Sequence, residues 1–99
     1  KLIDAFPNKI INIHPSLLPK YKGLHAVEQA LESGDTTTGC TAHYVTEELD
    51  SGAIICQSEV HIFPHDTVQS LTKVIQQREY EILPRAIQNV KQRLQVTSY

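Results

Sequence analysis

A chain of 99 residues has room for one domain with one modest core. Its formal net charge is −2 and its nine Lys and Arg residues are scattered, which excludes a basic nucleic-acid surface and favours small-molecule partners. The apolar runs are shorter than the roughly 18 residues of a membrane span, and Asp4 interrupts any signal-like start, so we expect a cytoplasmic protein with no membrane partner.

The first half of the chain predicts a buried strand, a loop and a helix. Residues 2–6 are typical of the end of a helix, stopped by the proline that follows. Residues 9–14 form a continuous β-branched run, typical of a strand that is covered on both faces and belongs to a parallel sheet. After a proline-bracketed loop, a helix that ends at Gly34 presents one apolar face, made of Ala26, Val27, Ala30 and Leu31.

The second half predicts two strands and a long helix. Residues 36–46 and 53–60 are rich in Thr, Tyr and Val, and a polar loop joins them. Asp66 is expected to cap a helix that begins at Thr67, and Pro84 should kink that helix or split it in two. The buried strand at 9–14 has no upstream strand to pair with in a parallel sheet, so the chain resembles the second half of an α/β domain.

Asn12, His14 and Asp50 are the candidates for chemistry. On a strand, side chains two residues apart leave the same face, so Asn12 and His14 can act on one small group. Taken alone, His14 would be a partly buried histidine satisfied by a backbone carbonyl. At the C-terminal end of a parallel strand, however, it would lie where α/β sheets bind ligands. Asp50 would stabilise the protonated imidazole and Asn12 would donate to a developing oxyanion, which suits acyl transfer to an external nucleophile.

The cysteines and histidines predict neither a disulfide nor a metal site. Cys40 and Cys56 lie sixteen positions apart in strand-like residues, and they fit buried small hydrophobes. His61 and His65 have i,i+4 spacing, but the proline at position 64 forbids the helix that would align them. We therefore expect no metal.

Two motifs resemble the folate-dependent formyltransferases. They are Asn-Ile-His-Pro-Ser-Leu-Leu-Pro-Lys-Tyr-Lys-Gly at 12–23 and Gly-Cys-Thr-Ala-His-Tyr-Val-Thr-Glu-Glu-Leu-Asp-Ser-Gly at 39–52, and the likeness runs from about residue 9 to residue 90. The resemblance implies a single segment, residues 1–99, that forms the C-terminal half of a Rossmann-like three-layer α/β fold with a mostly parallel sheet. The N-terminal half, whose Gly-rich loop grips the substrate phosphate in this family, would then be missing from the chain.

The resemblance also implies an activity, which is transfer of a formyl group from 10-formyltetrahydrofolate to the amine of glycinamide ribonucleotide in purine biosynthesis. His14 would be the general acid/base, Asp50 would support it, and Asn12 would hold the formyl oxygen. The remaining implied residues are Thr46, Glu47, Glu48, Leu49 and Asp50 for the pterin, Gln76 and Glu79 for the ribonucleotide, and Thr41 and His43 near the site.

Three other interpretations stay open. Formyltetrahydrofolate deformylases use a similar Asn, His and Asp set to pass the formyl group to water, but Pro15 stands where their pattern has a second histidine. Methionyl-tRNA formyltransferases share the Asn-x-His and Leu-Asp-x-Gly elements, but they lack the His43-Tyr44 pattern. The chain is alternatively a non-catalytic folate-binding or oligomerisation module. We expect either a homo-oligomer or association with a missing N-terminal half.

Overall fold

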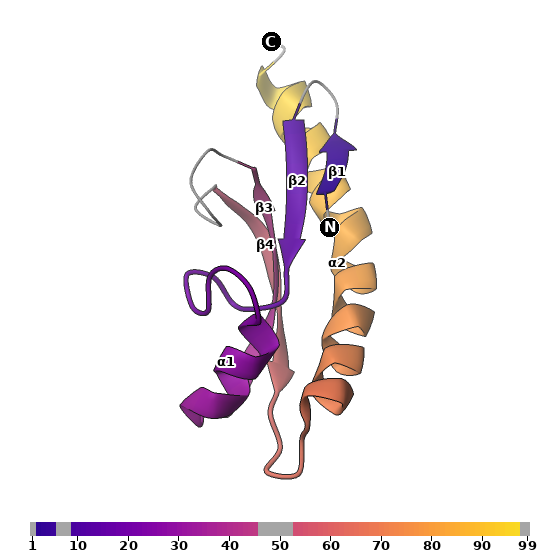
Figure 1. Cartoon of the computed structure of the whole chain (residues 1–99). Coiled ribbons are helices and arrows are strands. Elements are labelled where there is room, and N and C mark those ends of the chain that lie inside the picture. The colour runs from indigo at the N-terminus through magenta and orange to yellow at the C-terminus, as the bar shows by residue number, and fades with distance from the viewer. Residues whose placement is uncertain (1, 6–8, 46–52, 98–99) are drawn as a thin grey trace.

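The structure is a computed structural model that describes residues 2–5, 9–45 and 53–97 (Figure 1). Two strands precede each helix along the chain, and the longer helix runs beside the sheet. In chain order, the elements are β1 (Leu2–Ala5), β2 (Lys9–His14), α1 (Ala26–Ser33), β3 (Thr37–Tyr44), β4 (Ile54–His61) and α2 (Val68–Thr97).

The four strands form one sheet in the order β1-β2-β3-β4, and each neighbouring pair is antiparallel. The expectation of a mostly parallel sheet is therefore wrong for the described residues. The prediction rested on coverage of both faces of β2. Ile11 and Ile13 are buried on one face, where α2 packs. On the other face His14 is buried, Asn12 is half-buried and Ile10 is exposed, and the cover there is the loop between β2 and α1.

Residues 2–5 form a strand and not the end of a helix. β1 pairs with β2 in a register that places Leu2 opposite Asn12 and Ala5 opposite Lys9. Four residues are too few to display a helical period, so the pattern at the start of the chain did not distinguish the two states. β1 also supplies β2 with the neighbour that the sequence did not reveal.

The two helices confirm most of their predicted features. α1 ends at Gly34, whose φ of 79° is the left-handed conformation that glycine adopts at low cost. α2 is capped by Thr67, one residue beyond the predicted cap. The Thr67 hydroxyl accepts a hydrogen bond from the Ser70 amide at 3.1 Å, and the Ser70 hydroxyl accepts one from the Thr67 amide at 2.9 Å. Pro84 lies inside α2 without splitting it.

The core lies between α2 and one face of the sheet. It contains Ile11 and Ile13 of β2, Cys40 and Ala42 of β3, and a stripe along α2 at helical spacing made of Leu71, Ile75, Ile82, Ala86 and Val90. Within the described part of the chain, no helix combines the length and apolar character that crossing a membrane requires. Because α2 covers one face of the sheet, the face that carries the polar side chains of Asn12, His14, Thr41 and His43 is the other one.

Candidate functional site

Four polar side chains gather on the face of the sheet opposite α2. In the antiparallel register, Asn12 faces His43 and His14 faces Thr41, so all four side chains leave the same face of β2 and β3. His14, Thr41 and His43 are buried, and Asn12 is half-buried. The structure thus confirms that Asn12 and His14 share a face, and it brings Thr41 and His43 beside them, as expected.

The imidazole of His14 is held by the loop that follows it. Its Nε2 lies 2.8 Å from the backbone carbonyl oxygen of Tyr21. A carbonyl only accepts hydrogen bonds, so Nε2 is the nitrogen that carries a hydrogen. In the neutral ring, Nδ1 then carries the lone pair and is the atom that can take up a proton.

His43 holds the amide of Asn12. Nδ1 of His43 lies 3.1 Å from the carbonyl oxygen of Tyr44, to which it donates. Nε2 of the same ring can therefore accept a hydrogen bond, and Nδ2 of Asn12 lies 3.4 Å from it. The contact directs the amide nitrogen of Asn12 along the face that also carries His14.

Thr41 is the best-connected side chain of the site. Its hydroxyl donates to the carbonyl oxygen of Ser16 at 2.6 Å and accepts from the amide of Leu18 at 3.0 Å and from Nε2 of Gln57 at 3.0 Å. Gln57 also donates to the carbonyl oxygen of Leu18 at 3.0 Å. These bonds tie the loop after His14 to β3 and β4. The sequence does not reveal Gln57, which lies far from His14 along the chain. Tyr21 lies in the same motif as His14, but it acts through its backbone carbonyl, which its residue type does not reveal.

The other predicted site residues fall into two groups. Thr46, Glu47, Glu48, Leu49 and Asp50 lie outside the described residues, so their roles stay predictions. Gln76 and Glu79 lie on α2, which packs on the opposite face of the sheet; Gln76 is exposed and Glu79 is half-buried. Their contact with a ribonucleotide also stays a prediction.

The two cysteines are free thiols within the core side of the sheet. Burial raises the pKa of the Cys40 thiol to about 12, and burial also raises the pKa of Cys56. Neither thiol is thus suited to act as a nucleophile near neutral pH. Among the residues that the structure describes, no three or more His, Cys, Asp or Glu side chains lie close enough to bind a metal ion together.

Comparison with known proteins assigns this site to a family. The family model described as formyl transferase matches residues 1–87. The chain belongs to the formyl transferase family. The matched model is that of the family's N-terminal domain, so the chain is assigned to this domain, and the expected assignment to a C-terminal half is not supported. Motifs around a site identify a family more surely than they place a segment within its domain.

Two curated relatives are similar to most of the chain. Phosphoribosylglycinamide formyltransferase of Haemophilus influenzae is 47% identical over 87 residues, which are 88% of this chain and 41% of that protein. The trifunctional purine biosynthetic protein adenosine-3 of Chironomus tentans is 52% identical over 88 residues, which are 89% of this chain and 6% of that protein.

A solved structure agrees with these relatives. Glycinamide ribonucleotide transformylase 1 from Symbiobacterium toebii superposes with a TM-score of 0.79 at 51% identity, over 83% of this chain and 39% of that one. The chain therefore spans less than half the length of the proteins described here, and its fold within that span is that of formyltransferases.

Proposed function

We propose that this chain carries part of the active site for transfer of a formyl group from 10-formyltetrahydrofolate to the amine of glycinamide ribonucleotide, a step of purine biosynthesis. The observation that supports the proposal is the placement of Asn12 and His14 on one face of β2, with His43 bonded to the Asn12 amide. The chain that carries this pair is 47% identical to a protein named for that reaction.

His14 is assigned the proton transfers. Its Nε2 is committed to the carbonyl of Tyr21, so Nδ1 takes the proton that the attacking amine loses as it bonds to the formyl carbon. A base must be held still to be effective, and the buried setting of His14 meets that need. The bound folate supplies the formyl carbon as the electrophile. When the tetrahedral intermediate collapses, the bond from that carbon to the folate nitrogen breaks, and Nδ1 of His14 returns the proton to this nitrogen, so that tetrahydrofolate leaves.

Asn12 is assigned the formyl oxygen. An amide nitrogen has two hydrogens, and the contact with His43 turns this nitrogen toward the shared face. A donor already oriented in this way stabilises negative charge on an oxygen at little reorganisation cost. The side chains of Asn12 and His14 therefore fit a formyl group in their chemistry as well as in their placement.

The proposal extends to residues that the geometry does not test. The backbone from Thr46 to Asp50 is proposed to hold the pterin, Asp50 to support the protonated form of His14, and Gln76 and Glu79 to contact the ribonucleotide. We also propose that residues 1–99 are one segment of a larger Rossmann-like α/β domain, because the chain covers only 36–44% of the similar solved formyltransferases. A cytoplasmic location and an oligomeric or N-terminal partner stay predictions.

The test uses the protein at its natural length and measures both the formyl donor consumed and each formylated or released product. We expect 10-formyltetrahydrofolate to be consumed only when glycinamide ribonucleotide is present, with formylated ribonucleotide and tetrahydrofolate formed in equal amounts. Release of formate without the ribonucleotide would instead identify water as the acceptor. Absence of any turnover by a protein that still binds folate would favour a non-catalytic module.

A matched pair of histidine variants assigns the chemistry to the site. His14→Ala should lower kcat by about 10²- to 10⁴-fold, the usual contribution of a general acid/base, with little change in folate affinity. His61→Ala, which replaces an exposed histidine at the end of β4, should leave kcat unchanged. Equal kcat values in the two variants would remove the imidazole of His14 from the mechanism.

A further inference from the structure

Tyr21 contacts His14 through its backbone, in a conformation that tyrosine seldom adopts. Its carbonyl oxygen accepts the Nε2 hydrogen of His14, and its φ is 56°, in the left-handed region. That region is disfavoured for residues other than Gly, Asn and Asp. Local backbone preference therefore does not hold this carbonyl in place, and other contacts must do so.

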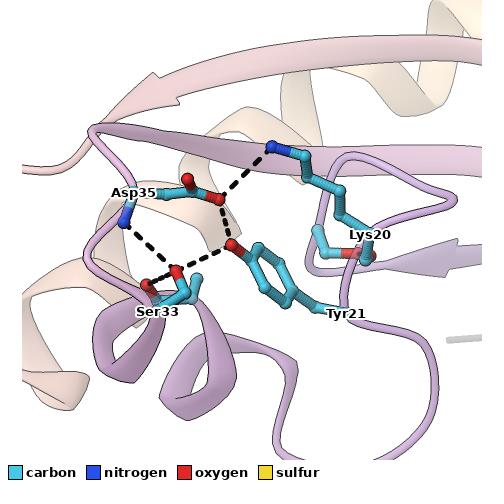
Figure 2. Close-up of polar contacts among 6 residues, drawn as sticks. Lys20, Tyr21, Ser33 and Asp35 are labelled. Carbon is cyan, nitrogen blue, oxygen red and sulfur yellow. Dashed lines mark hydrogen bonds and ion pairs between the residues drawn. The ribbon is translucent and has the colours of Figure 1, made fainter.

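The side chain of Tyr21 supplies those contacts at the far end of α1 (Figure 2). Its phenol hydroxyl donates to Oδ2 of Asp35 and lies 2.7 Å from Oγ of Ser33. Ser33 in turn accepts the Asp35 amide at 3.1 Å and donates to the carbonyl of Ala30 at 2.7 Å. Nζ of Lys20 lies 3.4 Å from the same carboxylate oxygen. The hydroxyl is thus held by Asp35, two residues beyond the end of α1, beside the Ser33 hydroxyl of the last turn.

The surroundings of Asp35 favour its ionised form. The Tyr21 hydroxyl, more than the nearby Lys20 ammonium, holds the pKa of Asp35 below its ordinary value. A hydrogen bond to a charged acceptor is stronger than one between neutral groups. The ring between the two ends of Tyr21 packs half-buried against the core, which makes the residue a stiff link.

We propose that the Tyr21–Asp35 pair is the anchor that positions the imidazole of His14, with Tyr21 transmitting the position of the α1 end to the Nε2 side of the ring. This inference rests on the proposed formyl transfer for its catalytic consequence. Tyr21 and Asp35 are positioning residues, because they act through His14 and do not touch the formyl group.

The kinetic test uses the protein at its natural length and removes each end of the anchor in turn. Tyr21→Phe removes only the hydroxyl and keeps the ring, and Asp35→Ala removes the carboxylate. Each variant should lower kcat by about 10-fold, since small displacements of a catalytic group have costs of this size, while both KM values change by less than about 2-fold. The double variant should be no slower than either single variant, because both changes break one contact.

Two controls separate positioning from a general loss of stability or charge. Asp66→Asn weakens the carboxylate that accepts the Phe63 amide at 2.8 Å and the Ser70 hydroxyl at 2.7 Å, and it leaves the Tyr21–Asp35 hydrogen bond in place. It should lower the unfolding midpoint without lowering kcat. Glu32→Gln removes an exposed charge from α1 and should change neither quantity.

A spectroscopic test needs no turnover. In ¹⁵N-resolved spectra at alkaline pH, the His14 ring of the unsubstituted protein should show the tautomer with hydrogen on Nε2, whereas Tyr21→Phe should show a mixture of both tautomers. An unchanged His14 tautomer in Tyr21→Phe together with an unchanged kcat would overturn the anchor. So would a fall in kcat for Asp66→Asn as large as that for Tyr21→Phe. A protein without transfer activity would refute the proposed function, and the tautomer comparison would still decide the anchor.

Discussion

Two buried threonines on β3 allow one substitution to be compared in opposite settings. Thr41 is fully buried, and its hydroxyl makes three hydrogen bonds to the loop after His14 and to Gln57. Thr38 is also buried, yet its hydroxyl has no hydrogen-bond partner among the described residues. Valine matches threonine in shape, so Thr41→Val and Thr38→Val each remove a hydroxyl and little else.

Thr41→Val should destabilise the protein, whereas Thr38→Val should not. A hydrogen bond contributes a net value of about 1 kcal/mol, so the loss of three at Thr41 lowers the free energy of unfolding by about 3 kcal/mol. At Thr38 the only change is relief of a buried unpaired hydroxyl, whose burial costs about 1–3 kcal/mol, so Thr38→Val should be neutral or stabilising. The predicted gap between the variants is therefore about 3 kcal/mol or more.

Urea unfolding followed by circular dichroism measures this gap from the two midpoints at a common m-value. Thr41→Val should also lower kcat, because the loop that carries the Tyr21 carbonyl loses its tie to β3. Stabilities of the two variants within about 0.5 kcal/mol of each other would show that the hydroxyl bonds of Thr41 do not hold the loop.

Two further predictions concern the sheet and the acidic limit of stability. Gly39→Ala should lower the free energy of unfolding by about 1–3 kcal/mol or more, because the new Cβ would lie 1.9 Å from the carbonyl oxygen of Ser58. A urea midpoint like that of the unsubstituted protein would contradict this prediction. The pKa values of Asp35 and Asp66 are both held below the ordinary value of 3.8, chiefly by the Tyr21 hydroxyl and by the Phe63 amide respectively. Because their native pKa values are the lower ones, their stabilisation is present above about pH 4 and is lost as pH falls through the native values. Urea midpoints measured between about pH 7 and pH 3 should therefore fall only at the acidic end, and Asp66→Asn should reduce that fall.

The features read correctly from the sequence depend on local spacing. The bounds of β2 follow from its continuous run of β-branched residues, and the shared face of Asn12 and His14 follows from the two-residue period of a strand. The end of α1 at Gly34 follows from the left-handed conformation that glycine accepts. Each of these inferences needs only neighbours within a few residues, and the structure confirms all three.

The features read wrongly depend on which distant segment covers a surface. The continuous β-branched run of β2 predicted a parallel sheet covered on both faces, but the sheet is antiparallel and the loop after His14 lies on the face opposite α2. No local pattern distinguishes a face covered by a helix from one covered by a loop. The cap of α2 was misplaced by one residue, because Asp66 and Thr67 are both good capping residues and only their contacts show which one acts.

The same distinction separates the reactive groups of the site from what holds them. Asn12 and His14 are visible in the sequence because their chemistry resides in the side chains. The group that orients His14 is a backbone carbonyl, and every residue has one, so its identity as that of Tyr21 appears only when the chain is folded. Thr41 and Tyr21 hold the two ends of one loop, the first through β3 and the second through α1. The position of the imidazole therefore depends on both attachments, and loss of either should affect kcat before it affects binding of the formyl donor.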